Sequence, residues 1–280
     1  MHTSDTITTL FCSSLASLIS RTVTYPLDTV KTLVQNNRTR AGIIPVVKTA
    51  LSTRKFSSFF QGLGVTLTLS VPASTVYFTT YDRVKVTAAE HGYNPDSFQV
   101  HTVCAVFAEG LSGLLFTPME VMKQKMQVNK KSTNTFHMAK SIYQDFGVRG
   151  FFRGYFLSQV VFVPYTVSYF VVYEKLKTIW GNYTGTSTES VVRSNLSGAA
   201  YFITSSLSAC IAGAITNPPE VVKTRAQIAS NVNTVKIVKE LWQEGGPRAF
   251  TKGLGARIAW IVPSMSLTVT MFELLKDSLL

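Results

Sequence analysis

A pattern of residues suited to ion pairing occurs three times in this 280-residue sequence. In each copy a proline is followed by an acid two residues later, a lysine after five and a glutamine after nine. The copies are Pro26, Asp28, Lys31 and Gln35; Pro118, Glu120, Lys123 and Gln127; and Pro218, Glu220, Lys223 and Gln227. Because the prolines lie 92 and 100 residues apart, the chain is a threefold repeat. We expect the units at 1–90, 91–187 and 188–280.

A second set of charges recurs later in each unit. Here an aromatic residue precedes an acid, and a lysine follows the acid three residues later. The members are Tyr81, Asp82 and Lys85; Tyr173, Glu174 and Lys177; and Phe272, Glu273 and Lys276. Each acid lies ten residues after a proline, at Pro72, Pro164 and Pro263. The three units can therefore supply two separate sets of ion pairs.

The segments that carry these charges are long and apolar. The chain is 46% hydrophobic and 15% charged, whereas soluble domains carry about 25% charged residues. Uncharged stretches at 63–81, 154–173 and 194–219 are long enough to cross about 30 Å of hydrocarbon. We expect six crossings, near 7–35, 63–85, 101–127, 154–177, 195–227 and 254–276. A large soluble protein with buried helices is the alternative left open.

The loops alternate in charge. Those at 36–61, 128–153 and 228–252 hold fourteen Lys and Arg residues, and those at 82–101 and 174–197 hold five. The positive-inside bias then places the three basic loops on one face of the membrane and both termini on the other. The membrane topology therefore explains the net charge of +12. Nucleic-acid binding would need a basic patch on a soluble fold, and the hydrophobic spans argue against such a fold.

Ionised side chains at membrane depth face a cavity and pair with one another, because burying them alone is costly. Three acids and three lysines on related helices can therefore close a ring of ion pairs around a pseudo-threefold axis. Two such rings, one at each end, would trap a solute if both were closed. Closing one while the other opens gives alternating access to a central site.

A third motif completes the repeat. The stretches "RKFSSFFQG", "FGVRGFFRG" and "GGPRAFTKG" end at Gly62, Gly154 and Gly253, with aromatic and basic residues just before each closing glycine. With all three motifs in order, nearly the whole chain resembles the mitochondrial carrier family. One departure is that the acid-glycine pair typical of that family before the closing glycine is absent from the first unit.

The resemblance implies an all-α membrane protein: six transmembrane helices in three pseudo-threefold repeats, with short amphipathic helices on the matrix side. It implies a matrix network of Asp28, Lys31, Glu120, Lys123, Glu220 and Lys223, braced by Gln35, Gln127 and Gln227. It implies a cytoplasmic network of Asp82, Lys85, Glu174, Lys177, Glu273 and Lys276, supported by Tyr81 and Tyr173. It also implies cardiolipin at the helix N-termini near Gly62, Gly154 and Gly253, where free amides favour anions.

Residues between the two rings are the candidates for substrate binding. Arg21 lies seven residues before Asp28, and Glu109 eleven before Glu120, so both lie roughly 20° from the face of their ring acid. In the resembled family the second long helix of each repeat binds substrate through positions two or three residues before its proline. These positions add Ser70, Phe162 and Trp260 to the candidates. Arg257 matches a basic position that these carriers often have. Structural or snorkelling roles remain the alternative for both arginines, and a proton-coupling or buried neutral role for Glu109.

These candidates favour a zwitterionic, amino-acid-derived or coenzyme-like metabolite. In the resembled family, carriers of keto acids and of simple amino acids usually have an arginine where Val161 and Phe162 stand, so these residues argue against both classes. The local sequence resembles that of glutathione carriers at 62–82 and that of S-adenosylmethionine carriers at 108–128. The alternative is a carrier-fold protein that has lost transport and serves as a receptor, insertase or scaffold.

We expect no enzyme, cofactor or metal site, because the four histidines are scattered and Cys12, Cys104 and Cys210 lie at no ligand spacing. The resemblance implies a monomer that binds a small solute and membrane lipid in the mitochondrial inner membrane. Its termini would face the intermembrane space. A peroxisomal or organelle-remnant location is the alternative.

Overall fold

The computed structural model describes residues 2–37, 43–53, 55–95, 97–129, 134–183, 198–229 and 233–279. Every regular element in these residues is helical. The long helices are α1 (His2–Asn36), α3 (Leu63–Glu90), α4 (Phe98–Val128), α6 (Tyr155–Tyr183), α8 (Gly198–Ile215) with α9 (Asn217–Ile228), and α11 (Leu254–Leu279). The short ones are α2 (Ile43–Thr53), α5 (Thr135–Phe146) and α10 (Thr234–Gly245), each followed by a 3₁₀ helix: η1 (Phe56–Phe60), η2 (Val148–Phe152) and η3 (Gly246–Thr251).

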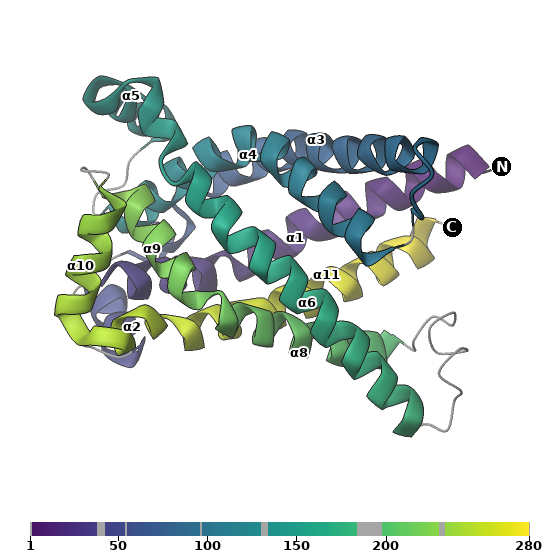
Figure 1. The fold of residues 1–280 in the computed structure, drawn as a ribbon. Coiled ribbons are helices and arrows are strands. Elements are labelled where there is room, and N and C mark those ends of the chain that lie inside the picture. The colour runs from purple at the N-terminus through teal and green to yellow at the C-terminus, as the bar shows by residue number, and fades with distance from the viewer. Residues whose placement is uncertain are drawn as a thin grey trace.

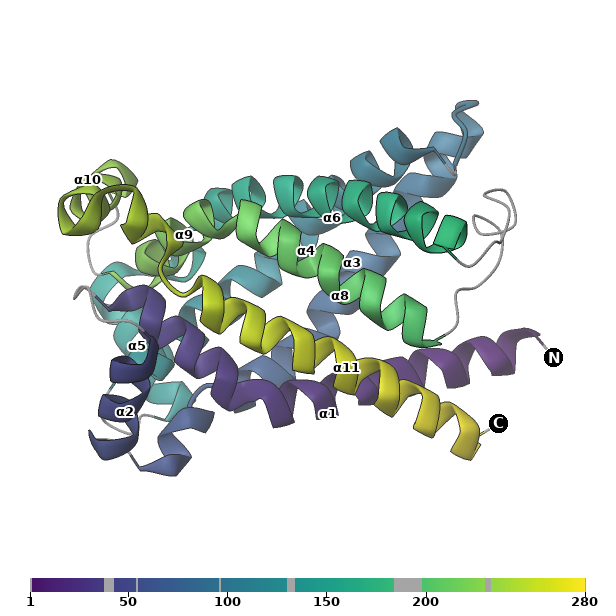
Figure 2. The same cartoon turned by 90° about the horizontal axis from the view of Figure 1, so that it is seen from below.

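The long helices close a ring. The most extensive packing is between α3 and α4, between α6 and α8, and between α11 and α1, so the last helix packs against the first. The short helices α2, α5 and α10 gather at one end of the molecule, and the two chain ends lie at the other (Figures 1 and 2). This arrangement confirms the all-α fold with six long helical units in three repeats, and it puts the described parts of the basic loops at the end opposite the termini.

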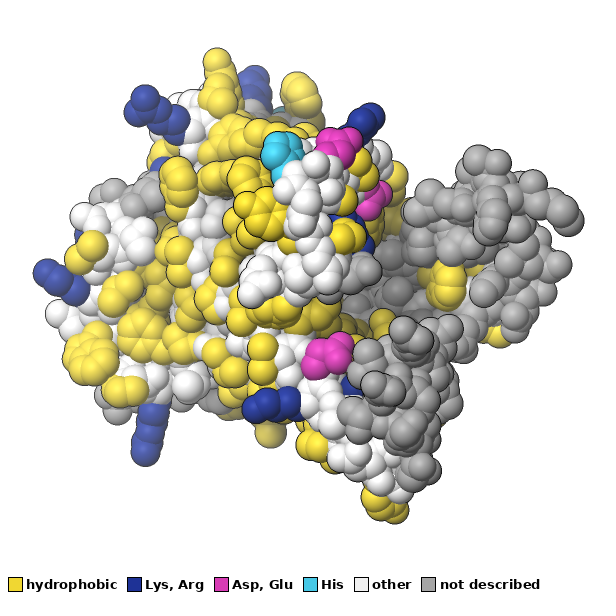
Figure 3. Space-filling view, turned by 45° about the vertical axis from the view of Figure 1, so that its right-hand side comes forward, with side chains coloured by type: hydrophobic (Ala, Val, Ile, Leu, Met, Phe, Trp, Pro, Cys, Tyr) yellow, Lys and Arg dark blue, Asp and Glu magenta, His cyan; other side chains and the backbone are white. Residues whose placement is uncertain are grey.

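Hydropathy supports a membrane location for most of the long helices. Four described helical segments are long and apolar enough to cross a bilayer: Phe56–Glu90, Phe98–Val128, Val148–Tyr183 and Thr234–Phe272. The bent pair α8 and α9 would be a fifth. Helix α1 has the length but is less apolar, since it is rich in Ser and Thr and carries Arg21, Asp28 and Lys31. Hydrophobic side chains are spread over the left and central part of the face seen in Figure 3, with Lys and Arg mostly around its edge.

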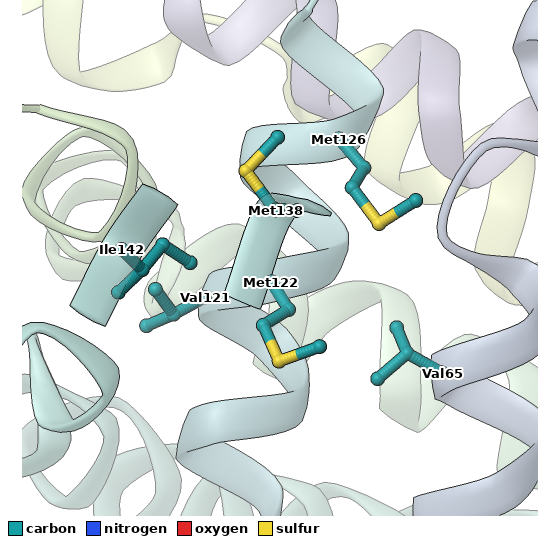
Figure 4. Packing of buried hydrophobic residues seen from close by; sticks show 6 residues of the cluster. All are labelled: Val65, Val121, Met122, Met126, Met138 and Ile142. Atoms are coloured by element: carbon teal, nitrogen blue, oxygen red, sulfur yellow. The ribbon is translucent and has the colours of Figure 1, made fainter. Parts of the chain in front are cut away.

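The buried apolar core lies towards the end with the short helices. One cluster joins α3, α4 and α5 through Val65, Val121, Met122, Met126, Met138 and Ile142 (Figure 4). A second joins α9 to α10 and η3 through Val221, Val222, Ala226, Ile237, Leu241 and Ala249. Each cluster anchors an amphipathic short helix beneath the charged part of a long one, and so fixes where the ion-pairing residues stand.

One expected helix is broken. The sequence predicts a single kinked crossing near 195–227, but the helix stops at Ile215 and resumes at Asn217 after a bend of 68°. Pro26 and Pro118 lie inside continuous helices, so one proline is compatible with continuity. In the third repeat Pro218 is followed by Pro219, and two successive residues without an N–H remove two helical hydrogen bonds. The second proline therefore explains why this helix is broken and the other two are not.

The closing glycines hold the turns that precede α3, α6 and α11. Gly62, Gly154 and Gly253 have φ of 85°, 76° and 76°, a left-handed conformation that glycine adopts without strain. Two of them also touch a ring glutamine of the next repeat. A Cβ at Gly154 would lie 3.1 Å from Cγ of Gln227, and one at Gly253 would lie 2.7 Å from Cγ of Gln35. The glycines therefore permit close packing between repeats as well as the turn.

Candidate functional site

Three ion pairs close the interior of the helical ring at the end with the short helices. Lys31 Nζ lies 2.6 Å from Glu220 Oε1, and Lys123 Nζ lies 2.6 Å from Asp28 Oδ2. The third pair joins Lys223 Nζ to Glu120 Oε2 at 2.8 Å. We call these six residues the ion-pair ring. Their side chains are mostly buried, with exposed fractions of 9% to 30%.

The pairs run in one direction around the molecule. Each lysine contacts the acid of the preceding repeat, and the lysine of the first repeat contacts the acid of the third. No pair lies within one helix, so the proline-acid-lysine spacing serves contacts between repeats. The ring therefore joins α1, α4 and α9 to one another.

Two of the three ring glutamines donate to ring acids. Gln127 Nε2 lies 2.9 Å from Asp28 Oδ2, and Gln227 Nε2 lies 3.0 Å from Glu120 Oε2. Gln35 is fully buried but differs, because its Oε1 accepts a 3.0 Å bond from the Thr224 hydroxyl. The glutamine stripe thus lies beside the ring in all three repeats, but only two of its members bond to it.

The second set of charges lies towards the end with the termini. Asp82 and Glu174 are exposed, in contrast to the buried acids of the ion-pair ring. Tyr173 stacks on Tyr169, and the hydroxyl of Tyr81 contacts Nδ1 of His101. Lys85 and Lys177 are half-buried. The side chains of Glu273 and Lys276 lie outside the described ones, so the expected cytoplasmic network stays a prediction.

A cavity of about 580 Å³ extends from the ion-pair ring towards the end with the termini. Its walls come from α1, α4, α6, α9 and α11. No described residue of α3 or α8 lines it. The three repeats therefore line the cavity unequally. The cavity contains Arg21, Glu109, Phe162, Trp260 and Arg257, five of the six candidate substrate residues.

Ser70 is placed differently. It is 4% exposed, its hydroxyl donates to the Leu67 carbonyl at 3.3 Å, and it is not among the described lining residues. Position counting gives the face on which a residue lies but not how close its helix comes to the cavity.

The two charged candidates on α1 and α4, Arg21 and Glu109, break the threefold symmetry. Arg21 lies five residues before its proline, where the other repeats have Gly113 and Gly213. Those glycines pack against α6 and α11, since a Cβ at Gly113 would lie 3.1 Å from Tyr155 and one at Gly213 would lie 3.2 Å from Ile261. An arginine there is not required for packing and instead reaches the cavity.

Glu109 also stands where the other two repeats have a small residue. It lies nine residues before its proline, where the other repeats have Ser17 and Ala209. It is half-buried, lines the cavity, and its carboxylate is within electrostatic range of Lys223 and Glu120. A positive and a negative side chain thus occupy positions that the repeats leave small.

Arg257 and Trp260 on α11 are also peculiar to one repeat. They lie four and seven residues after Gly253, where the first repeat has Thr66 and Leu69 and the second has Ser158 and Val161. Arg257 is 6% exposed and donates to the Gly213 carbonyl at 3.1 Å, and its guanidinium lies 5.8 Å from the Tyr165 ring centroid. An asymmetric solute can be recognised only where the symmetry is broken, and four such positions meet in this cavity.

Sequence reasoning missed Tyr165, which lines the cavity one turn beyond Phe162. The signal was present, because residues three apart share a helical face. It also missed a second ionic cluster, in which Arg225 forms two bonds to Glu244, at 2.7 and 2.9 Å. Lys252 joins the same carboxylate at 3.0 Å, and both cations donate to the Asn37 carbonyl. This cluster ties α9, α10 and the C-cap of η3 in the third repeat to the end of α1.

A smaller cavity of about 460 Å³ adjoins Gly154, the start of α6 and Thr234 at the start of α10. Two arginines, Arg149 and Arg153, line it together with aromatic residues. Arg153 stacks on Phe146, with its guanidinium carbon 3.6 Å from the ring centroid, and donates to the Ala229 carbonyl at 2.5 Å. The cavity therefore combines cations, helix N-termini and apolar walls.

Comparison with known proteins agrees with this architecture. The family model described as mitochondrial carrier protein matches three times, at residues 2–92, 94–184 and 194–280. Mitochondrial substrate carrier family protein E of Dictyostelium discoideum is 30% identical over 291 residues, covering 95% of this chain and 94% of that protein. Human solute carrier family 25 member 33 is 27% identical, covering 97% and 94%. Calcium-dependent mitochondrial ATP-magnesium/phosphate carrier protein 3 of Arabidopsis thaliana is 29% identical, covering 96% and 56%.

Proposed function

We propose that this chain, which belongs to the mitochondrial carrier family, carries a zwitterionic, amino-acid-derived or coenzyme-like metabolite by alternating access. Members of this family are solute transporters of the mitochondrial inner membrane rather than enzymes, and the chain is a multi-pass transporter of this kind. The substrate class and the alternation between two gates are the proposal.

The observation that carries it is the cavity closed at one end by the ion-pair ring. Threefold-related residues form the ring, whereas residues that break the symmetry line the cavity. The ring is internally neutral, so the surplus charges in the cavity are Arg21, Arg257 and Glu109. Two cations and one anion on different helices suit a solute that carries both signs, and Phe162, Tyr165 and Trp260 add aromatic surface for a flat group.

Alternation follows from the electrostatics of the ring. Breaking one buried pair strands two charges, which is strongly destabilising unless new partners appear. A bound solute can provide such partners, and pairing within the second set of charges at the other end, which includes Asp82 and Glu174, would offset the energy lost by opening the ring. The ring therefore acts as a gate that opens when the opposite set closes.

The test is a thermal-shift screen of the purified protein with nucleotides, S-adenosylmethionine, glutathione, amino acids and organic acids, followed by uptake into liposomes. We expect one class to raise the Tm and to enter the liposomes. Both effects should be lost in Arg21→Ala and Glu109→Ala and kept in Lys140→Gln, which alters an exposed lysine on α5. Ligand binding that survives both cavity substitutions would refute this site. If no solute binds or is transported, the alternative of a receptor, insertase or scaffold is favoured.

We propose the orientation that the basic loops predict, with the short helices in the matrix and both termini in the intermembrane space. An epitope added after Leu280 should be accessible in mitochondria whose outer membrane is ruptured. An epitope inserted before Thr135 should be accessible only after detergent is added. The reverse pattern would invert the assignment of the two gates.

We also propose cardiolipin as a structural lipid at Gly62, Gly154 and Gly253. The cavity beside Gly154 supports this, because its arginines and helix N-termini suit a lipid phosphate and its aromatic walls suit acyl chains. Cardiolipin should raise the Tm of the protein in detergent, whereas phosphatidylcholine should not. Arg149→Gln should reduce the shift. An equal response to both lipids would refute the proposal.

A further inference from the structure

The three pairs of the ion-pair ring are held by different neighbours. Asp28 and Glu120 each accept a glutamine amide, from Gln127 and Gln227. Glu220 receives no such bond, because the Nε2 of Gln35 has no hydrogen-bond partner among the described residues. Thr224 occupies the other end of that amide at 3.0 Å. The Lys31–Glu220 pair therefore lacks the donor that its two counterparts have.

Lys31 has an aromatic neighbour instead. Its Nζ lies 5.5 Å from the centroid of the Trp260 ring, and both residues line the cavity. A cation over an indole face is attracted by the ring electrons, more strongly than over tyrosine or phenylalanine. The contact holds Lys31 at a residue that lines the cavity, whereas Gln127 and Gln227, which hold the other two acids, are not among the described lining residues.

Lys123 offers a contrast within the same ring. Its Nζ lies 5.6 Å from the centroid of Tyr25, but Tyr25 is 2% exposed and is not among the described lining residues of the cavity. Trp260 is half-buried and open to the cavity. A solute can therefore cover Trp260 but cannot reach Tyr25.

We propose that Trp260 is a positioning residue for the ion-pair ring, which holds Lys31 on Glu220 and makes this pair the one that responds when the cavity is filled. A solute whose flat or cationic group lies on the indole displaces Lys31 from it. Arg257, whose charge also acts on Glu220, then keeps that carboxylate from being stranded. The inference rests on the proposed transport function and specifies which of the three pairs opens first.

The first test measures the coupling between Lys31 and Glu220 by thermal unfolding of the full-length protein. Lys31→Gln, Glu220→Gln and the double variant are made in three backgrounds: wild type, Trp260→Phe and Trp260→Ala. The same cycle with Lys123→Gln and Asp28→Asn is the matched control. We expect Trp260→Ala to reduce the Lys31–Glu220 coupling by half or more, Trp260→Phe to retain most of it, and the control cycle to stay unchanged. An equal loss in both cycles, or none, would overturn the proposal.

The second test uses Trp260 as the only tryptophan, with Trp180 and Trp242 replaced by phenylalanine. Lys31→Gln should shift its emission and increase its quenching by acrylamide, whereas Lys123→Gln should do neither. S-adenosylmethionine, glutathione and ATP are then added as probes. A probe that raises the Tm should change the emission and weaken the Lys31–Glu220 coupling. If it stabilises the protein and leaves that coupling intact, the proposal is wrong.

These measurements separate the inference from the proposed function. Neither the coupling cycle without probes nor the emission of Trp260 depends on transport. A protein with the expected coupling but no uptake of any probe would contradict transport alone. A protein that transports a probe while its Lys31–Glu220 coupling ignores Trp260 would contradict the inference alone.

Discussion

Arg225 holds Glu244 with both terminal guanidinium nitrogens, at 2.7 and 2.9 Å, and its side chain is 7% exposed. Its remaining donors reach the carbonyls of Gln35 and Asn37 at 3.1 Å. One carboxylate on α10 thus fixes an arginine on α9 that caps the end of α1. The contact lies next to the ion-pair ring, because Gln35 follows Lys31 by four residues, about one turn of α1.

The Glu244→Gln substitution is expected to destabilise the protein. It leaves Arg225 and Lys252 beside a neutral amide, and stranding a buried charge costs about 3–5 kcal/mol. Glu244 is 15% exposed, so we expect a value near the lower end, seen as a clear decrease in Tm in detergent. Asp145→Asn is the control, since this exposed acid contacts Ser141 in the second repeat. Equal Tm values for the two variants would contradict this account.

The Gly253→Ala substitution should disrupt the junction between the third and first repeats. Alanine at φ 76° is strained, and its Cβ would lie 2.7 Å from Cγ of Gln35, whose fully buried side chain has little room to move. We expect a decrease in Tm and loss of uptake by the reconstituted protein.

Gly64→Ala is the matched control for this position. Gly64 lies inside α3, and a Cβ there would meet nothing within 4 Å. Alanine is favoured over glycine within a helix by up to about 1 kcal/mol, so this variant should be neutral or slightly stabilised. If Gly253→Ala behaved like Gly64→Ala, the close packing between Gly253 and Gln35 would be refuted.

The sequence was sufficient for the repeat, the six long helical units and the residues of the ion-pair ring. These depend on residue type at fixed offsets, and each offset recurs three times. Arg21 and Glu109 could also be placed on the cavity face, because helical periodicity carries over from a nearby ring acid.

Other features depend on distances that periodicity does not give. Ser70 and Phe162 stand at related positions, but only Phe162 lines the cavity, which lies towards α6 and α11. The break at Thr216 was not predicted, because the repeated pattern contains one proline and the third repeat has two in succession, Pro218 and Pro219. The cluster of Arg225, Glu244 and Lys252 joins residues from three elements whose separation in the sequence has no period.

Exchanging the charges of Asp28 and Lys123 tests whether their 2.6 Å contact acts as an ion pair in the gate. Asp28→Lys alone places three cations together, since Lys31 is also within electrostatic range of this carboxylate, and should abolish uptake. Lys123→Asp alone puts two acids side by side and should also abolish uptake.

Combining the two substitutions restores opposite charges, and Gln127 can rotate its amide to offer its oxygen to the new lysine. The neighbouring Lys31 still opposes that lysine, so we expect partial recovery of Tm and uptake. Contacting pairs typically couple by about 0.5–3 kcal/mol, which a double-mutant cycle resolves. Two substitutions whose effects simply add would show that these residues do not act as a pair.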